Sequence, residues 1–249
     1  MATLLVSFIL YVTVPDKGQT RFGTNWRKEF GGVIQVISSP KFWQIAPITL
    51  MSQATFLSIQ SLWVGPWLRD VAGMNSGEVA HTLMLTASAM VAGFLILGAA
   101  AERAAKYGVQ PMAFAIIGML VFMLVQIGLL LVGIAQTVSA NLIIANWALF
   151  GFFGTIGIIP YAVLSQTFPP HLAGRVTTAV NFLVFMAAFA TQSGVGVIVE
   201  MWSLVGEGSY DPKGYSTAFA VLIGLQLLGL VWYMINRGDI VSQKPETGC

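Results

Sequence analysis

Long runs of uncharged, mostly apolar residues dominate the sequence. Each run lacks Asp, Glu, Lys and Arg entirely and is about 20 residues long or longer. About 20 helical residues span a membrane core about 30 Å thick, and lipid offers no partner for the polar groups of an irregular backbone. The pattern therefore predicts membrane-spanning helices over residues 42–66, 82–101, 111–134, 141–167, 176–199 and 215–236.

A shorter apolar run occupies residues 1–14. No Lys or Arg precedes it and basic residues follow it, which is the reverse of the order in a secretory signal. We interpret it as the end of a span that begins outside this chain, with a short first span as the alternative. The predicted organisation is a truncated helix over 1–14, a cytoplasmic linker over 15–41, a six-helix domain over 42–236 and a cytoplasmic tail over 237–249.

Lys and Arg are divided unevenly between the loops on the two sides of these spans. Ten fall on the side of the linker and two, Arg69 and Lys213, on the other, whereas the acidic residues divide five to five. Cytoplasmic loops are enriched in Lys and Arg rather than in net charge. The sequence predicts a multi-pass protein of the cell (inner, cytoplasmic) membrane with a cytoplasmic carboxyl terminus.

The linker carries apolar residues at near-helical spacing between its basic residues. An amphipathic helix on the inner membrane surface fits this pattern. An irregular basic loop also fits, because Gly31 and Gly32 weaken a helix. The apolar residues are Trp26, Phe30, Val33, Ile34 and Ile37.

Composition supports the membrane interpretation and excludes several kinds of chemistry. Hydrophobic residues make up 56% of the chain and charged residues 9%, where about 25% charged is usual for soluble domains. The single cysteine, Cys249, permits no intrachain disulfide or cysteine cluster. His81 and His171 lie in predicted loops on opposite sides, and no nucleophile, phosphate-binding or nucleic-acid motif occurs. We therefore expect no enzyme activity, cofactor, metal site or nucleic-acid partner.

Uncharged polar side chains occur inside the predicted spans. Gln53 and Gln60 are seven residues apart in the first span and so lie on one side of it. Asn146 and Asn181 lie in the fourth and fifth spans. Such residues either line a cavity for water and substrate or form hydrogen bonds between helices. Helix contact is the usual role for a single residue, but for these four together we predict a substrate cavity.

Three glycines and a proline punctuate the fourth span. Gly151, Gly154 and Gly157 repeat every three residues, and Pro160 follows. Small residues let membrane helices approach closely, and proline removes a backbone hydrogen bond and bends a helix. The segment is either a gating kink near the inner end of the span or a passive packing groove.

The loop between the second and third spans contains a glycine, an acid–arginine pair and a further basic residue, namely Gly98, Glu102, Arg103 and Lys106. It resembles the cytoplasmic signature of the major facilitator superfamily. The match is partial, because Glu102 replaces the commoner aspartate, Ala105 stands where glycine is usual and Tyr107 replaces a second basic residue. We expect a conformational latch, in which Gly98 permits close helix approach and the charged residues bridge to helix ends. The alternative is a basic loop that only sets topology.

Residues 39–43 and 169–175 also resemble loops of that family. The resemblance implies an all-α membrane protein, with residues 1–14 as the end of a sixth helix and the six later spans as helices seven to twelve, arranged as two inverted three-helix repeats. It further implies alternating-access transport of a small solute. This chain would be the carboxy-terminal half, and its partners would be the lipid bilayer, the solute and an amino-terminal six-helix half from the same gene or a separate chain.

Two other functions fit the sequence. One is a seven-span ligand-sensing receptor in which residues 4–14 form a real span. A retinal-binding version is excluded because no Lys lies in any span. The other is an inactive or accessory membrane fragment.

Overall fold

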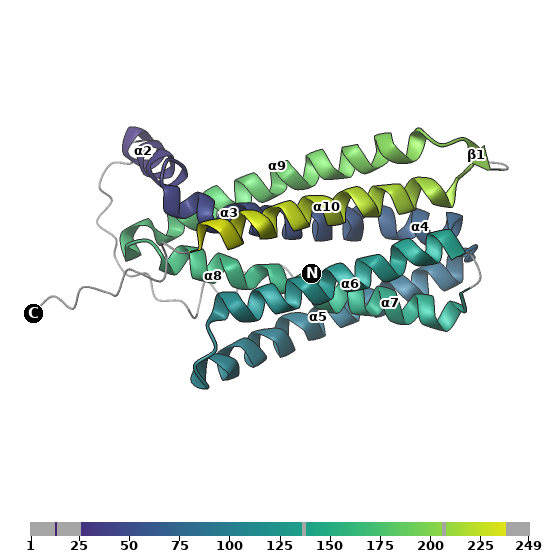
Figure 1. Cartoon of the computed structure of the whole chain (residues 1–249), viewed down its shortest axis with the longest axis horizontal. Helices are drawn as coiled ribbons and strands as arrows, with labels where there is room; N and C mark the ends of the chain where they lie inside the picture. Colours follow the sequence, from purple (N-terminus) through teal and green to yellow (C-terminus); the bar gives the residue numbers. More distant parts are fainter. Residues whose placement is uncertain (1–12, 14–25, 136–137, 206–207, 238–249) are drawn as a thin grey trace, which may run out of the picture.

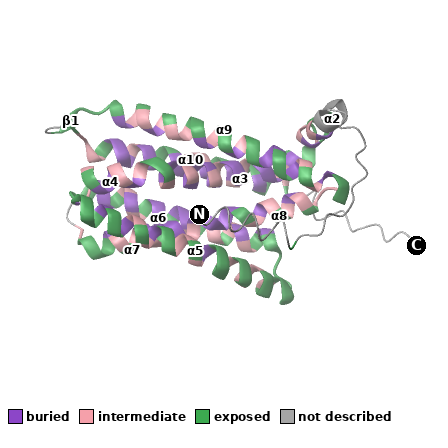
Figure 2. Cartoon of the chain, turned by 180° about the vertical axis from the view of Figure 1, so that it is seen from behind, coloured by how far each residue is buried: buried purple, intermediate pink, exposed green. Residues whose placement is uncertain are grey.

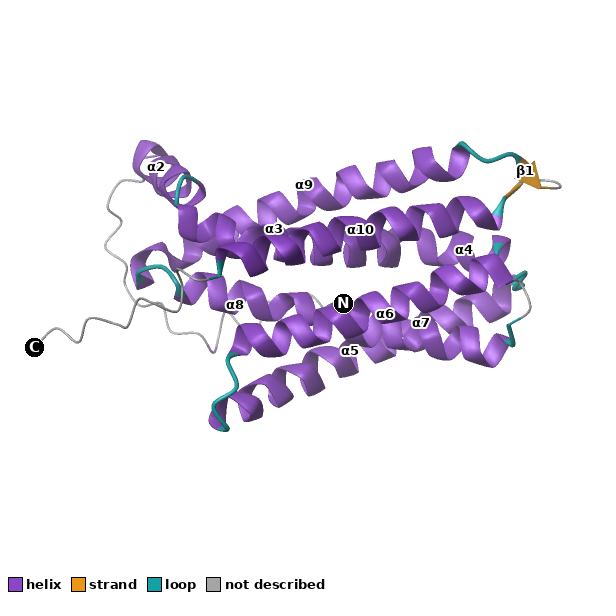
Figure 3. Ribbon diagram, viewed as in Figure 1, coloured by secondary structure: helices purple, strands orange, loops and turns teal. Residues whose placement is uncertain are grey.

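The computed structural model describes residues 13, 26–135, 138–205 and 208–237, and this part of the chain is almost entirely helical (Figure 1, Figure 3). The predicted all-α class is confirmed, with a two-stranded hairpin as the only sheet among these residues. The elements are α2 (Trp26–Ile37), α3 (Pro40–Ser58), the π-helical η1 (Ile59–Trp63), α4 (Val64–Asp70), α5 (Ser76–Lys106), α6 (Pro111–Ala135), α7 (Ala140–Gly154), the 3₁₀ segment η2 (Thr155–Ile158), α8 (Ile159–Gln166), the 3₁₀ turn η3 (Pro170–Leu172), α9 (Ala173–Glu200), β1 (Leu204–Val205), β2 (Ser209–Tyr210) and α10 (Pro212–Asn236).

Five helical segments of the described chain are long and apolar enough to cross a membrane. They are Ser76–Lys106, Pro111–Ala135, Ala140–Gln166, Pro170–Glu200 and Pro212–Asn236. Four of them contain a predicted span, and Ala140–Gln166 covers all but the last residue of the predicted span 141–167. Each is helical because a charge-free run must satisfy its own backbone in lipid.

The predicted first span over 42–66 is helical but is not among those five. The chain is helical from Pro40 to Asp70, yet η1 divides it and leaves α3 with 19 residues. α3 also contains buried hydroxyl side chains at every third position, Thr49, Ser52, Thr55 and Ser58. The first span is thus the most polar and the most irregular of the predicted six.

The helices pack in a pattern that relates the first three to the last three. α5 packs on α7 and α3 on α9; α6 packs on α7 and α10 on α3; α5 packs on α6 and α9 on α10. In this pattern α3 corresponds to α7–α8, α5 to α9 and α6 to α10, so each contact in one half has a counterpart in the other. The α6–α10 contact is its own counterpart and joins the two halves. α3 starts at the end of the bundle near α2 and α7 starts at the opposite end (Figure 1). The packing therefore has the symmetry of two inverted three-helix repeats.

Two buried glutamines join α6 and α10 where the repeats meet. Nε2 of Gln126 donates to Oε1 of Gln226 at 3.2 Å, and Nε2 of Gln226 donates to Oε1 of Gln126 at 2.9 Å. The side chains are 0% and 1% exposed. Because each amide satisfies the other, both polar groups are stabilised inside an apolar bundle.

Burial is uneven among the helices (Figure 2). In the most apolar window of each span, 39–44% of residues are buried in α6, α7–α8 and α10, against 11% in α5 and 22% in the span that contains α9. α5 and α9 therefore present the largest exposed apolar faces of the described chain.

The linker prediction left two alternatives, and the structure has the helical one. α2 covers Trp26–Ile37 and packs on α9. Gly32 lies directly against the side chain of Arg175, where an added Cβ would overlap the guanidinium group. This glycine therefore serves a close approach between α2 and α9. The predicted truncated helix over 1–14 and the tail over 237–249 lie almost entirely outside the described residues.

The described basic residues gather at the α2 end of the bundle. Lys41, Arg103, Lys106, Arg175 and Arg237 lie at this end, against Arg69 and Lys213 at the end with the β-hairpin. The uneven division of Lys and Arg between the predicted loops therefore corresponds to an uneven division between the two ends of the bundle.

Candidate functional site

The first helix of each three-helix repeat is interrupted. The helix that starts with α3 passes through the π-helical segment η1, and the helix that starts with α7 passes through the 3₁₀ segment η2. Changes of helix type inside a helix are frequent at functional sites. In membrane transporters, interrupted helices often form the substrate site near the middle of the bilayer.

Pro160 explains the change of helix type in the second repeat. It lies in the first turn of α8, immediately after η2. Because proline has no N–H, it cannot donate to the carbonyl of Ile156 as a continuous α-helix requires. The sequence predicted a kink at Pro160, and the structure places the irregular turn directly before it.

The three glycines of the fourth span lie against other helices. An added Cβ on Gly151 would overlap the backbone carbonyl of Thr86 in α5, and one on Gly154 would overlap the Phe56 ring of α3. An added Cβ on Gly157 would lie 2.9 Å from Cγ and Cδ of Gln53. These glycines therefore allow α7 and η2 to contact both α5 and α3.

Gln53 and Gln60 both carry an unpaired amide oxygen. Gln53 is half-buried in α3 beside Gly157, and Gln60 is half-buried in η1. Oε1 of each is buried and has no hydrogen-bond partner among the described residues. An unsatisfied buried polar atom costs about 1–3 kcal/mol, so each oxygen marks a place for a water molecule or a polar ligand.

Two serines extend this group of unpaired oxygens. The hydroxyl oxygens of Ser52 and Ser58 are buried in α3 and also lack partners among the described residues. Sequence reasoning had not singled out Ser58. The spacing of three between Thr55 and Ser58 was the signal that could have found it, because residues three apart are neighbours on a helix surface.

Asn146 and Asn181 lie apart from the two glutamines. Nδ2 of Asn146 donates to the carbonyl of Val125 in α6 at 3.3 Å, and its side chain lies against Gly128. Asn146 is therefore a contact between helices. Asn181 is exposed on α9. Of the four predicted cavity residues, Gln53 and Gln60 share one feature, a buried amide oxygen without a partner among the described residues, and they lie seven residues apart along α3 and η1.

Hydrogen bonds with α9 and α10 hold the interrupted first helix within η1 and at the end of α4. Nε1 of Trp63 donates to the carbonyl of Gln192 at 3.1 Å, and Nε2 of Gln192 donates to the Ser61 hydroxyl at 3.4 Å. At the end of α4, the Tyr215 hydroxyl donates to Oδ2 of Asp70 at 2.6 Å. These long-range bonds position η1 and α4 against α9 and α10, and no local sequence pattern indicated them.

Comparison with known proteins identifies the family. A model of the Major Facilitator Superfamily matches residues 1–192 of the 249, which includes α2 to α8, both interruptions and most of α9. The chain belongs to the major facilitator superfamily. It is a multi-pass membrane protein of a transporter family. Searches of curated proteins and of solved structures find no match.

The four residues that resemble the superfamily signature all lie in the last turns of α5 (Ser76–Lys106), so the predicted loop is helical as far as Lys106. Nζ of Lys106 and Oε1 of Glu102 form an ion pair at 2.9 Å within this helix, with the two side chains 71% and 73% exposed. Nothing in the described chain lies within 4 Å of a Cβ built on Gly98. Such an exposed pair contributes at most about 1 kcal/mol, so the motif does not stabilise this bundle appreciably by itself.

An exposed stripe on α5 leads to those signature residues. It runs along the helix with spacings of three and four, which places its members on one face. Gly98 and Glu102 occupy the last two positions of this stripe. The stripe consists of Met84, Ser88, Val91, Leu95, Gly98 and Glu102.

Proposed function

We propose that this chain is the carboxy-terminal half of an alternating-access transporter of the major facilitator superfamily, and that a small solute binds beside Gln53 and Gln60. The observation that carries the proposal is the pair of unpaired, buried amide oxygens on an interrupted membrane helix. A polar solute with hydroxyl or N–H groups supplies the donors that these oxygens lack.

The interruptions supply a means of movement. η1 and η2 each break the regular hydrogen-bond pattern of a long helix, so the segments on the two sides can shift with little loss of backbone bonding. Gln53 lies against Gly157 in η2, so a solute that binds Gln53 contacts both interrupted helices. Pro160 and the three glycines then act as a hinge between binding and closure.

The exposed faces of α5 and α9 support a second, amino-terminal six-helix half as partner. Gly98 at the end of the α5 stripe has open space around it, which suits close approach of a helix from another domain. Glu102 and Arg103 lie beside it and supply charges for helix ends of the other half. In this arrangement the signature acts as a latch between halves, and each half lines one side of the cavity.

The direct test measures solute uptake by membrane vesicles from cells that express the complete coding sequence of the gene. The vesicles are incubated with an isotope-labelled metabolite extract, filtered and analysed by mass spectrometry. We expect at least one small solute to accumulate above the level in vesicles from cells without the gene. Saturable binding without accumulation would instead favour a ligand-sensing receptor, and neither result would favour an inactive fragment.

A further inference from the structure

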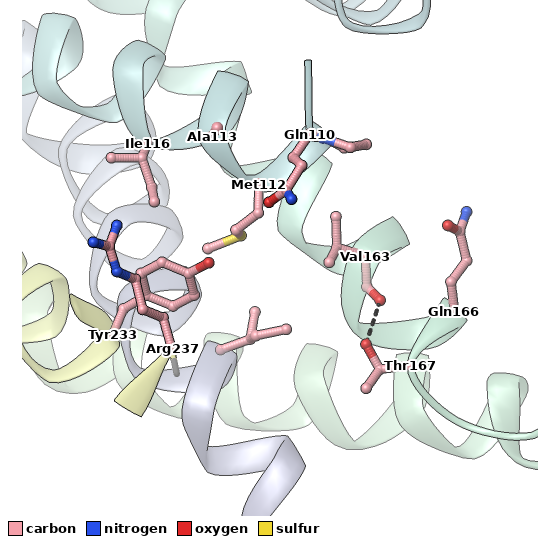
Figure 4. Close-up of a pocket in the computed structure, with 11 residues that line it drawn as sticks. Gln110, Met112, Ala113, Ile116, Val163, Gln166, Thr167, Tyr233 and Arg237 are labelled. Carbon is pink, nitrogen blue, oxygen red and sulfur yellow. Dashed lines mark hydrogen bonds between the residues drawn. The ribbon is translucent and has the colours of Figure 1, made fainter. Parts of the chain in front are cut away.

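A pocket lies at the α2 end of the bundle (Figure 4). It has a volume of about 610 Å³ and lies between the start of α3, the start of α6, α8 and the end of α10. Most of its lining is apolar, with Ile45, Met112, Ile116 and Val163 among the contributing side chains. Its polar lining residues are Gln110, Gln166, Thr167, Tyr233 and Arg237.

Tyr233 is the buried polar group of this pocket. Its side chain is 8% exposed, and its hydroxyl has no hydrogen-bond partner among the described residues. In Figure 4 the hydroxyl points toward Met112, across the pocket. Because this hydroxyl faces the pocket and forms no hydrogen bond within the described chain, it can donate to a ligand that accepts a hydrogen bond.

Arg237 adds a positive charge beside Tyr233. It caps the carboxyl end of α10, where the helix dipole favours a cation. No acidic side chain lines the pocket, and no carboxylate in the described chain forms an ion pair with Arg237. Thr167, by contrast, already donates its hydroxyl to the Val163 carbonyl at 2.9 Å (Figure 4).

The start of α6 faces the same pocket. The first N–H to bond in this helix is that of Phe114, to the Gln110 carbonyl at 3.1 Å, so the N–H groups of Met112 and Ala113 remain outside the helical ladder. The first turn contains no acidic residue. A helix start of this kind favours anions through its N–H groups and its dipole.

We propose that this pocket binds the phosphate group of an anionic phospholipid, with Arg237, the Tyr233 hydroxyl and the start of α6 as its donors. The three groups belong to the start of α6 and the end of α10, and all of them line this pocket. The pocket lies at the ends of membrane helices, which is where lipid headgroups meet a spanning protein, and its apolar lining suits the beginning of an acyl chain. Basic pockets between membrane helices are known sites for such headgroups.

The test is a titration of the purified full-length protein in a neutral detergent with short-chain phosphatidic acid, followed by native mass spectrometry. We expect Arg237→Gln to weaken lipid binding about tenfold or more, because it removes a charge-assisted hydrogen bond. We expect Tyr233→Phe to weaken it about threefold. Lys213→Gln removes one charge from the opposite end of the same helix and should leave binding unchanged.

Two comparison ligands separate the possible sources of the phosphate. Phosphatidylcholine of the same chain length should bind more weakly than phosphatidic acid, and millimolar inorganic phosphate should fail to displace the lipid. Inorganic phosphate that binds as tightly as the lipid would overturn the phospholipid assignment. Equal lipid binding by the Arg237→Gln and Lys213→Gln variants would overturn the site itself.

Discussion

Replacing Gly151 with alanine is expected to reduce the free energy of unfolding by about 3 kcal/mol, the upper part of the usual range for overpacking. The added methyl group would overlap the backbone carbonyl of Thr86 in α5, and a backbone atom cannot move aside as a flexible side chain can. Gly93 meets the Phe152 carbonyl from the other helix in the same way, so α5 and α7 approach each other at two glycines. Chemical denaturation in detergent measures the effect.

Gly224→Ala is the matched control for this experiment. Gly224 also lies inside a membrane helix, but nothing lies within 4 Å of a Cβ built on it. Because alanine is the better helix former by about 1 kcal/mol, this variant should be as stable as the original protein or slightly more stable. Equal stability of the two alanine variants would show that α5 and α7 do not meet closely at Gly151.

Replacing Gln53 with methionine is expected to slow solute uptake roughly tenfold at low solute concentration. Methionine keeps the length of the side chain but removes the amide, and a neutral hydrogen bond of about 0.5–1.5 kcal/mol corresponds to a factor of up to about ten. Gln60→Met should have a similar effect. Folding should not suffer, because each change removes a buried oxygen that has no partner among the described residues.

Gln44→Met provides the control, because Gln44 is a half-buried glutamine of the same helix, α3, near its start. The initial rate of uptake, measured with the solute found in the vesicle experiment, should be unchanged in this variant. If Gln53→Met transports at the rate of Gln44→Met, the solute does not depend on the Gln53 amide.

The positions of the membrane helices could be predicted because lipid leaves a charge-free run few choices. Helical segments occur at every predicted span, and the boundaries of α6 and α10 fall close to the prolines and charges that flank the runs. The two helix interruptions, η1 and η2, were harder to predict from the sequence. Pro160 indicated the one before α8, whereas no proline or glycine lies within η1, whose Trp63 and Ser61 side chains form hydrogen bonds with Gln192 of α9.

The roles of single polar residues could not be read from the sequence, because those roles depend on which helices pack together. Asn146 and Gln53 look alike as uncharged residues in apolar runs, yet Asn146 bonds to α6 and Gln53 keeps an unpaired oxygen. Gln126 and Gln226 are 100 residues apart and satisfy each other. Their pairing follows from the contact between the two repeats, which no local pattern specifies.

The most direct test of alternating access is the reactivity of a single cysteine at position 60, introduced as Gln60→Cys after Cys249→Ser and replacement of any other cysteine in the full-length protein. A membrane-impermeant maleimide is applied to right-side-out and inside-out vesicles. Ser209→Cys, at the hairpin end, should react only in right-side-out vesicles, and His171→Cys, at the α2 end, only in inside-out vesicles. If position 60 faces each side of the membrane in turn, its cysteine reacts in both preparations. Reaction from one side alone would contradict alternating access at this position.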